Sequence, residues 1–341
     1  MINLLITGGA GFIGSNFARH WIKKNPEDNI VIFDKLTYAG NKKNIEEFES
    51  NYNFSFVQGD ITDSKLLELV LRKFNITHIA NFAAETHVDR SINSPIEFIK
   101  TNIFGTYSLL NCFKEYWEEK GSLDNYRFLH ISTDEVFGSL GIHDKPFNEN
   151  SPYYPRSPYS ASKASSDHLI KAWHSTYGLP VMVSNCSNNF GPYHYPEKLI
   201  PLAIINILIE KNIPIYGNGS NIRDWLYVED HCSALEMIIK SNNFGESFCI
   251  GGSNELSNIE IIKMICNSMD KILNYKSIKK SEDLIRFVPD RLGHDFRYSI
   301  DSSKLKREFN WERKVSLQEG INKTINWYID NKSWWEPLLG N

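Results

Sequence analysis

Short apolar runs alternate with stretches of helical periodicity through the first half of the chain. Six runs rich in Val, Ile, Leu and Phe have the length of strands: 2–7, 29–33, 54–57, 76–82, 127–132 and 179–184. Between them apolar residues recur every three or four positions, most clearly in 15–24, 94–117 and 159–177, which is the period of a helix face. Strands that alternate with helices predict an α/β fold, a doubly wound parallel sheet of the Rossmann type.

The rhythm changes after about residue 190. Helical patterns occupy 198–211, 229–240, 259–273 and 317–329, and shorter strand-like runs lie at 214–217, 223–228, 247–251 and 285–288. This half predicts a second, smaller mixed α/β lobe. We expect a first domain over residues 1–187, with some return elements from about 225–250, and a second domain over 188–341.

Composition removes several classes of function. Of the 341 residues 41% are hydrophobic and 23% charged, which is typical of globular domains, and the net charge of −4 disfavours nucleic acid as a partner. No apolar run approaches membrane-spanning length, and the first residues lack the features of a signal peptide. The five cysteines form no C-x-x-C pair and the histidines show no metal-ligand spacing. We therefore expect a cytoplasmic protein with free thiols, no metal and no membrane partner.

The first predicted strand runs into a glycine turn that opens a helix. Gly8, Gly11 and Gly14 have the spacing that permits a tight turn, close approach of a pyrophosphate and close packing of helix on strand. Asp34 ends the second strand about 20 residues further on, where a carboxylate accepts hydrogen bonds from ribose hydroxyls and repels a 2′-phosphate. The sequence thus predicts a dinucleotide site that takes NAD.

Two further groups carry candidate chemistry. Tyr159 and Lys163 are four residues apart and share a helix face, so the lysine ammonium can favour the phenolate that removes an alcohol proton. The run 127–132 ends in Thr133, Asp134 and Glu135, a hydroxyl followed by two carboxyls at the strand edge where ligands bind in open α/β sheets. Taken alone, this end could equally be a solvated turn capped by an aspartate.

Together these motifs resemble a known family. T-G-G-A-G-F-I-G (7–14), Asp34, Thr133 and Y-S-A-S-K (159–163) look like the extended short-chain dehydrogenase/reductase family of nucleotide-sugar enzymes. S-T-D-E-V-F-G (132–138) resembles its dTDP-glucose 4,6-dehydratase subfamily, as do the stretches 34–41, 82–91, 188–201 and 217–231 and the pair Trp334-Trp335. Leu292 departs from the pattern, because a proline is expected between Arg291 and Gly293.

The resemblance implies a lyase that takes part in deoxysugar biosynthesis. Tyr159 would take the proton of the sugar 4-hydroxyl while hydride passes from C4 to NAD⁺, with Thr133 and Lys163 assisting. Glu135 would then remove the C5 proton and Asp134, protonated, would help the C6 hydroxyl leave as water. Return of hydride to C6 and of a proton to C5 would give dTDP-4-keto-6-deoxyglucose. Two adjacent buried carboxyls can divide the roles of acid and base in this way.

The resemblance also assigns binding residues and an assembly. The cofactor-binding set is Gly8, Gly11, Phe12, Ile13, Gly14, Asp34, Lys35, Thr37, Asp60, Ile61, Ala83, Ala84, Thr101, Tyr159, Lys163 and Asn189. The substrate-binding set is Thr86, Thr133, Asn188, Lys198, Leu199, Tyr216, Arg223, Asn258, Arg291 and His294. Helices over 95–117 and 158–177 that are apolar on more than one face indicate a homodimer.

Two rivals stay open on the sequence. One is a UDP-sugar enzyme of the same family, either an epimerase or a UDP-glucose 4,6-dehydratase. The residues alone do not separate dTDP from UDP, since the two differ by a methyl on the base and a hydroxyl on the sugar. The other is a non-catalytic NAD-binding regulator, which has no need of Thr133, Tyr159 and Lys163 together.

Overall fold

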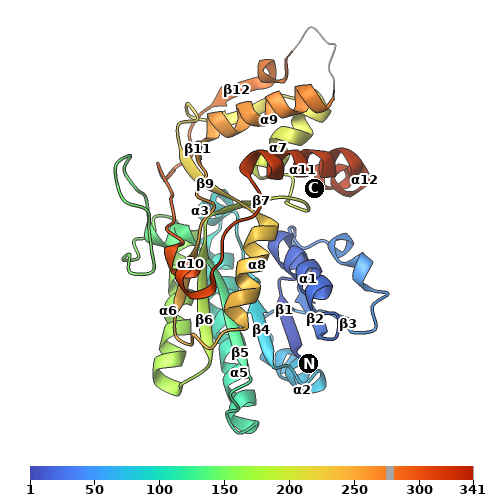
Figure 1. Cartoon of the computed structure of the whole chain (residues 1–341), viewed down its shortest axis with the longest axis vertical. Coiled ribbons are helices and arrows are strands. Elements are labelled where there is room, and N and C mark those ends of the chain that lie inside the picture. The colour runs from blue at the N-terminus through green and yellow to red at the C-terminus, as the bar shows by residue number, and fades with distance from the viewer. Residues whose placement is uncertain (274–279, 341) are drawn as a thin grey trace.

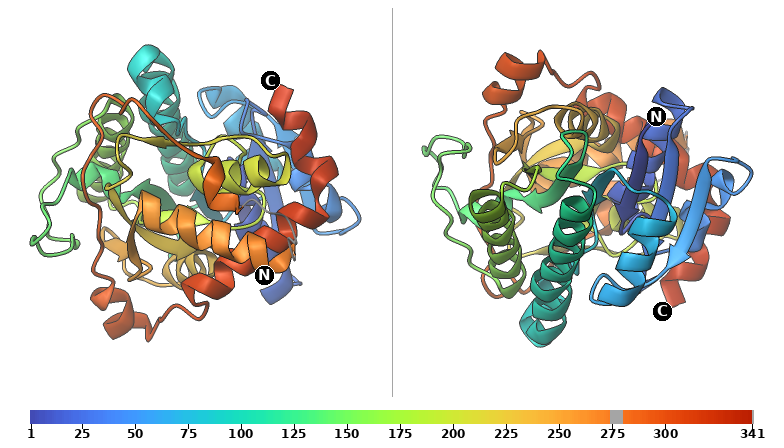
Figure 2. Two further views of the ribbon diagram at one scale, coloured as in Figure 1. Left: turned by 90° about the horizontal axis from the view of Figure 1, so that it is seen from above. Right: turned by 90° about the horizontal axis from the view of Figure 1, so that it is seen from below.

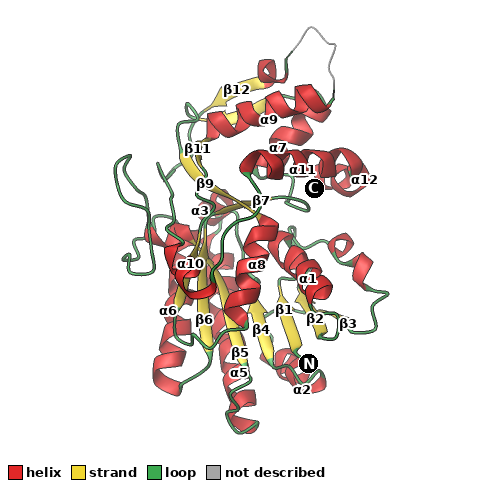
Figure 3. Ribbon diagram, viewed as in Figure 1, coloured by secondary structure: helices red, strands yellow, loops and turns green. Residues whose placement is uncertain are grey.

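The computed structural model describes residues 1–273 and 280–340 and consists of two lobes (Figure 1). The larger lobe is a parallel sheet covered by helices, and the smaller lobe combines helices with two short sheets (Figure 3). The large sheet contains β1 (Asn3–Thr7), β2 (Asn29–Asp34), β3 (Phe54–Gln58), β4 (His78–Asn81), β5 (Arg127–Thr133), β6 (Val181–Cys186) and β10 (Ser247–Ile250). The predicted α/β fold with a smaller mixed lobe is confirmed.

The strand order of the large sheet is β10-β6-β5-β4-β1-β2-β3, and every neighbouring pair is parallel. From β1 the chain adds β2 and β3 toward one edge of the sheet, and then adds β4, β5, β6 and β10 toward the other edge, so the strand order reverses between β1 and β4. That reversal leaves a crevice at the carboxyl ends of the strands, which is where ligands bind in sheets of this kind. The glycine turn follows β1 at this point.

Alternate residues of the strands enter two different apolar clusters. Leu4 and Ile6 pack with one set of helices, and Leu5 packs with the other. The first set is α1 (Phe12–Lys24), α8 (Val228–Ile239) and α10 (Ser303–Phe309), and the second is α2 (Ser64–Lys73), α5 (Thr106–Glu119) and α6 (Pro158–Tyr177). Figure 2 shows helices on both sides of the strands. Because both faces are buried, the strands read as continuous apolar runs.

A third apolar cluster forms the core of the smaller lobe. Its helices are α7 (Leu199–Leu208), α9 (Asn258–Ile272), α11 (Leu317–Asp330) and α12 (Lys332–Trp335). One short sheet joins β11 (Glu255–Ser257), β9 (Ile222–Tyr227) and β7 (Asn188–Phe190), and the other joins β12 (Ile285–Val288) to β8 (Ile213–Tyr216). The polar sequence of β7 did not predict a strand. The strand forms because its backbone pairs with β9.

The helix predicted over 94–117 changes its winding part-way. After α3 (Val88–Asn93) come α4 (Pro95–Phe98), a π-helical segment (Ile99–Gly105) and then α5. In the π segment the buried Asn102 side chain accepts a hydrogen bond from the Glu85 backbone N–H at 2.9 Å and donates to the Glu85 carbonyl at 3.1 Å. Its amide nitrogen also donates to Ser162 Oγ at 2.8 Å. Segments of this kind often mark functional sites, and this one brings Thr101 to the main cavity.

No helix in the described part of the chain is both long and apolar enough to cross a membrane. The five cysteines are all buried free thiols.

Candidate active site

A cavity of about 370 Å³ lies between the carboxyl ends of the sheet and the segment 186–200. All sixteen residues predicted to bind the cofactor line it, and so do the five predicted catalytic residues. Of the predicted substrate residues, the cavity is lined by Thr86, Thr133, Asn188, Lys198 and Leu199. One enclosed space thus brings together most of the residues that the sequence singled out.

The glycine turn makes room for a ligand at the start of α1. Gly8 has φ +66°, and a Cβ added there would lie 2.6 Å from the Ala83 backbone nitrogen on the loop after β4. A Cβ on Gly14 would lie 2.9 Å from Gly9 Cα, so this glycine lets α1 pack directly on the turn. The free N–H groups at the helix N-terminus, with this cradle, fit the pyrophosphate of a dinucleotide.

Asp34 stands at the end of β2, with its carboxylate held in place from two sides. The backbone N–H groups of Ala10 and Leu36 donate to its two oxygens at 2.9 Å and 2.8 Å. Burial raises the pKa of Asp34, and the two backbone donors oppose that shift. Beside it, Lys35 pairs with Asp60 at 2.8 Å. This fixed acceptor at the cavity wall fits the ribose hydroxyls of NAD.

The catalytic candidates Thr133, Asp134 and Glu135 mark the step from β5 into a 3₁₀ turn (Asp134–Phe137). Thr133 Oγ1 lies 3.2 Å from Asp134 Oδ1, while Asp134 Oδ2 is buried and has no hydrogen-bond partner among the described residues. Burial raises the pKa of Asp134 well above its usual range, and the Glu135 charge adds to the shift. Burial therefore favours the protonated form of Asp134.

Glu135 differs from its neighbour in the charges around it. Burial raises its pKa as well, but Arg291 and Arg223 oppose the shift. Cations that oppose the shift make Glu135 the easier of the two to ionise. A carboxyl group that favours its protonated form and one that ionises more easily thus lie side by side on one turn.

Helix α6 presents Tyr159 and Lys163 in its first turns. Ser157 caps this helix by a capping box with Ser160, Pro158 occupies the first turn, and Gly178 ends it with φ 70°. Burial raises the pKa of Tyr159 well above 10 and the Glu135 charge adds to the shift, while the Thr133 hydroxyl lowers it.

Lys163 is only 3% exposed, and burial lowers its pKa to about 8. Its ammonium donates to the Ile131 carbonyl at 2.8 Å and lies 3.3 Å from His130 Nε2.

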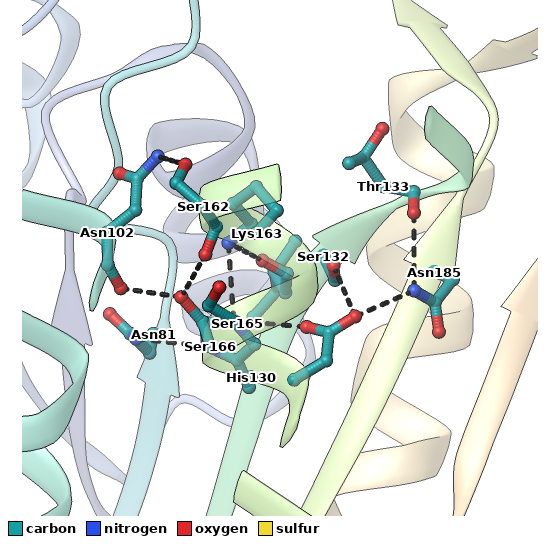
Figure 4. Close-up of polar contacts among 12 residues, drawn as sticks. Asn81, Asn102, His130, Ser132, Thr133, Ser162, Lys163, Ser165, Ser166 and Asn185 are labelled. Atoms are coloured by element: carbon teal, nitrogen blue, oxygen red, sulfur yellow. Dashed lines mark hydrogen bonds and ion pairs between the residues drawn. The ribbon is translucent and has the colours of Figure 1, made fainter. Parts of the chain in front are cut away.

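The sequence analysis missed a polar cluster behind these residues. Asp167, His130 and Asn185 are each completely buried, and Asp167 contacts both of the others and Ser132. Figure 4 shows His130 and Asn185 close to Lys163 and Ser132. One signal was available, because Asp167 follows Lys163 by four residues on the same helix and so shares its face.

The sequence analysis also missed contacts at the edge of the cavity. The Arg90 guanidinium lies 3.6 Å above the Tyr38 ring and 3.6 Å from Glu197, and His87 lies 3.4 Å from the same carboxylate. These four residues come from three separate segments.

The other predicted substrate residues lie outside the cavity lining. Tyr216, Arg291 and His294 gather near Asp89, which accepts from Tyr216 at 3.3 Å and pairs with Arg291 at 3.7 Å. Asn258 begins α9 and its backbone N–H donates to Asn221.

Arg223 is 5% exposed, donates to the Ile222 and Asp295 carbonyls and stacks on Tyr298. Its charge still acts on Glu135. Leu292, where the chain departs from the family pattern, is 76% exposed.

Comparison with known proteins decides the family. The family model described as GDP-mannose 4,6 dehydratase matches residues 5–324. The dTDP-glucose 4,6-dehydratase of Neisseria meningitidis is 50% identical over 99% of this chain and 96% of its own, and that of Escherichia coli is 49% identical with the same coverage. This chain belongs to the dTDP-glucose 4,6-dehydratase family.

Solved structures agree with that assignment. The dTDP-glucose 4,6-dehydratase of Streptomyces venezuelae, solved with NAD bound, is 42% identical with a TM-score of 0.91 and covers 99% of this chain and 100% of its own. The UDP-glucose 4-epimerase of Thermotoga maritima is 26% identical with a TM-score of 0.84, at 97% and 100% coverage. Dehydratases and epimerases thus share this fold, so the chemistry depends on the residues of the site.

Proposed function

We propose that this member of the dTDP-glucose 4,6-dehydratase family converts dTDP-glucose to dTDP-4-keto-6-deoxyglucose and water, with NAD as its resident cofactor. The observation that carries the proposal is the pair Asp134 and Glu135 in the cavity that also holds Tyr159. A proton donor with a free buried oxygen beside a carboxylate supported by arginines is what elimination of water requires. Epimerisation at C4 has no use for this pair.

Each residue has one proton to move. Tyr159 removes the proton of the 4-hydroxyl, and the Thr133 hydroxyl beside it favours the phenolate. Oxidation at C4 makes the C5 hydrogen acidic, and Glu135 takes it as a proton. Asp134 gives its proton to the departing C6 hydroxyl, so that water leaves and the carboxylate remains to be reprotonated. The acid and the base are adjacent in the chain, as C5 and C6 are in the sugar.

The geometry of the predicted cofactor-binding residues supports NAD as the cofactor. The glycine cradle, the fixed Asp34 carboxylate and Lys163 would hold its pyrophosphate, adenosine ribose and nicotinamide ribose in turn. When bound, NAD supplies the hydride acceptor for C4, the hydride donor for C6 and a positive ring that favours the Tyr159 phenolate. Arg90, Tyr38, Glu197 and His87 close one edge of the cavity and would slow cofactor loss between the two half-reactions.

The nucleotide diphosphate is assigned to the cations next to Glu135. Lys198 lines the cavity. Arg291 acts on Glu135 through its charge and makes a long ion pair of 3.7 Å with Asp89, so we assign its guanidinium to the phosphates as well. Arg223 already bonds two backbone carbonyls, so we assign it mainly to the support of Glu135. Tyr216, His294 and Asn258 stay predicted substrate residues.

Separate incubations with dTDP-glucose and UDP-glucose test the function. We expect a 4-keto-6-deoxy sugar nucleotide from dTDP-glucose, identified by mass loss of one water and by the ketone signal in NMR. Formation of a galactose nucleotide without loss of water would identify an epimerase. Turnover of UDP-glucose in preference to dTDP-glucose would move the chain to the UDP-glucose dehydratases. Binding of NAD without turnover of either sugar would favour a regulator.

We also propose that the chain forms a homodimer in the cytoplasm. Apolar side chains of α4, the π segment and α5 are exposed, among them Ile96 (50%), Phe104 (59%) and Tyr107 (45%), and a second copy would cover them. Five free buried thiols suit a reducing compartment. Sedimentation at micromolar concentration tests the dimer, and a monomer at that concentration would contradict it. Fractionation of cells tests the location.

A further inference from the structure

We propose that Asp167 is a positioning residue for the reaction: its buried carboxylate balances the charge of Lys163 and holds the end of β5 from which Thr133 and Asp134 project. The inference rests on the proposed function and extends it to a residue outside the cavity lining. Asp167 lies one helical turn beyond Lys163 on α6 and is completely buried.

One carboxylate oxygen of Asp167 ties three segments together. Oδ2 accepts hydrogen bonds from Ser132 Oγ at 2.8 Å, from the Tyr153 hydroxyl at 2.8 Å and from Asn185 Nδ2 at 3.2 Å. Ser132 immediately precedes Thr133, and Asn185 Nδ2 also donates to the Thr133 carbonyl at 3.2 Å. The Asp167 carboxylate therefore fixes β5 against α6 and β6 at the residue where the catalytic turn begins.

His130 lies between the other oxygen of Asp167, Oδ1, and the Lys163 ammonium. Asp167 Oδ1 has no hydrogen-bond partner in the described chain and lies 3.5 Å from His130 Nε2, the same nitrogen that lies 3.3 Å from Lys163 Nζ. Asn81 uses its amide oxygen to accept from Thr7, so its amide nitrogen donates to His130 Nδ1 at 3.1 Å. Nδ1 is therefore the acceptor of the ring, and Nε2 lies between Lys163 Nζ and Asp167 Oδ1.

Burial favours the neutral form of five titratable groups near Lys163. Burial lowers the pKa of His130 well below its usual range and raises those of Tyr159, Cys186, Tyr153 and Asp134. Burial raises the pKa of Asp167 as well, but Lys163 and three hydrogen-bond donors oppose that shift. Among these six groups, Asp167 is the one whose ionised form is favoured by the Lys163 charge together with three hydrogen-bond donors.

The consequence concerns the alkaline limit of activity. Burial lowers the pKa of Lys163 to about 8, and Asp167 is the leading influence that opposes the shift. Without the carboxylate charge we expect the lysine to lose its proton at lower pH, and with it the positive charge that favours the Tyr159 phenolate. A variant without the charge is expected to lose activity at lower pH than the wild type, with little change at the acidic side.

The test is the pH profile of kcat/KM for dTDP-glucose in the holoenzyme, with NADH formation in a single turnover as a second readout. In Asp167→Asn, which keeps the oxygen that accepts the three hydrogen bonds, we expect the alkaline limb to move down by about one pH unit. Asp167→Glu restores the charge and should restore the limb. Tyr153→Phe is the matched control, because it removes a bond to Asp167 but keeps the charge, and its limb should stay in place.

Two results would overturn the proposal. One is an Asp167→Asn enzyme that is slower by the same factor at every pH, and the other is a limb that moves as far in Tyr153→Phe. If Asp167→Asn does not fold, Lys163→Met/Asp167→Asn decides: recovered folding supports charge balance, and a double variant as unfolded as the single one refutes it. Wild-type enzyme without turnover of dTDP-glucose would refute the proposed function instead.

Discussion

Two buried carboxyl groups, those of Asp134 and Asp167, lie close to the end of β5. Their surroundings differ in how far they stabilise the ionised form. Asp134 lines the cavity, and its Oδ2 has no hydrogen-bond partner among the described residues. Burial is the larger cause that raises its pKa, and the Glu135 charge is the second. Asp167 lies behind the strand, where Lys163 and three donors support its ionised form. The comparison shows that burial alone does not set the role of a carboxyl: its nearest neighbours do.

The largest effect is expected on the cavity side. Glu135→Gln and Asp134→Asn should each lower kcat by about 10²–10⁴-fold, because each removes a proton transfer. In D₂O, Asp134→Asn should still exchange hydrogen at C5 of the substrate, whereas Glu135→Gln should not. Both should accumulate NADH on mixing with dTDP-glucose, while Tyr159→Phe should form none. If Asp134→Asn turned over dTDP-glucose at the wild-type rate, Asp134 would not be the general acid.

On the far side of the strand the expected effect is on stability. Asp167→Ala leaves the hydroxyl groups of Ser132 and Tyr153 without their acceptor and removes one of two hydrogen bonds of Asn185, so we expect the free energy of unfolding to fall by about 3 kcal/mol or more. Asp134→Ala removes an oxygen that has no partner, and should leave stability unchanged or raise it. Urea unfolding of the two alanine variants measures the difference. Equal losses would show that the two carboxyls play the same structural part.

The pH dependence of stability sharpens the same contrast. The folded-state pKa of Asp134 is raised above its unfolded value, so the group favours folding at low pH and this contribution is lost as pH rises through the folded pKa. The unfolding free energy of Asp134→Asn relative to wild type should therefore grow by about 1.4 kcal/mol per pH unit above the unfolded pKa. Urea midpoints across this range measure it, with the exposed Asp330→Asn as control. A constant difference would mean that wild-type Asp134 is ionised.

The smallest effect is expected for one bond to Asp167. Ser132→Ala removes a single hydrogen bond of 2.8 Å to a charged group and should cost about 1.5 kcal/mol of stability, with little change in kcat. Ser165→Ala is the control, since the half-buried Ser165 also donates one bond of 2.8 Å, but to the Ala161 carbonyl on its own helix. Thermal unfolding compares the two. A loss of kcat as large as in Asp134→Asn would place Ser132 in the chemistry.

Local patterns carried most of the fold and the cavity. The strands that become β1 to β6 are continuous apolar runs because both faces of the sheet are covered, and helix α6 begins at Ser157-Pro158, where a capping residue precedes a proline. The same patterns failed for β7, whose pairing with β9 uses only backbone, and for the π segment, where the Asn102 side chain bonds the distant Glu85 and Ser162. Propensity does not report such long-range bonds.

The sequence by itself determined the order of strands and helices, the glycine turn with Asp34, and the residue types for alcohol oxidation and elimination, because each depends on spacing along a short stretch. Only the tertiary structure decided which charges meet. It buried Arg223, a predicted substrate-binding residue, against backbone carbonyls, and placed Asp167 and His130 behind Lys163. A pKa depends on burial and on charges that are remote in the chain, so only the folded chain sets Asp134 apart as the acid.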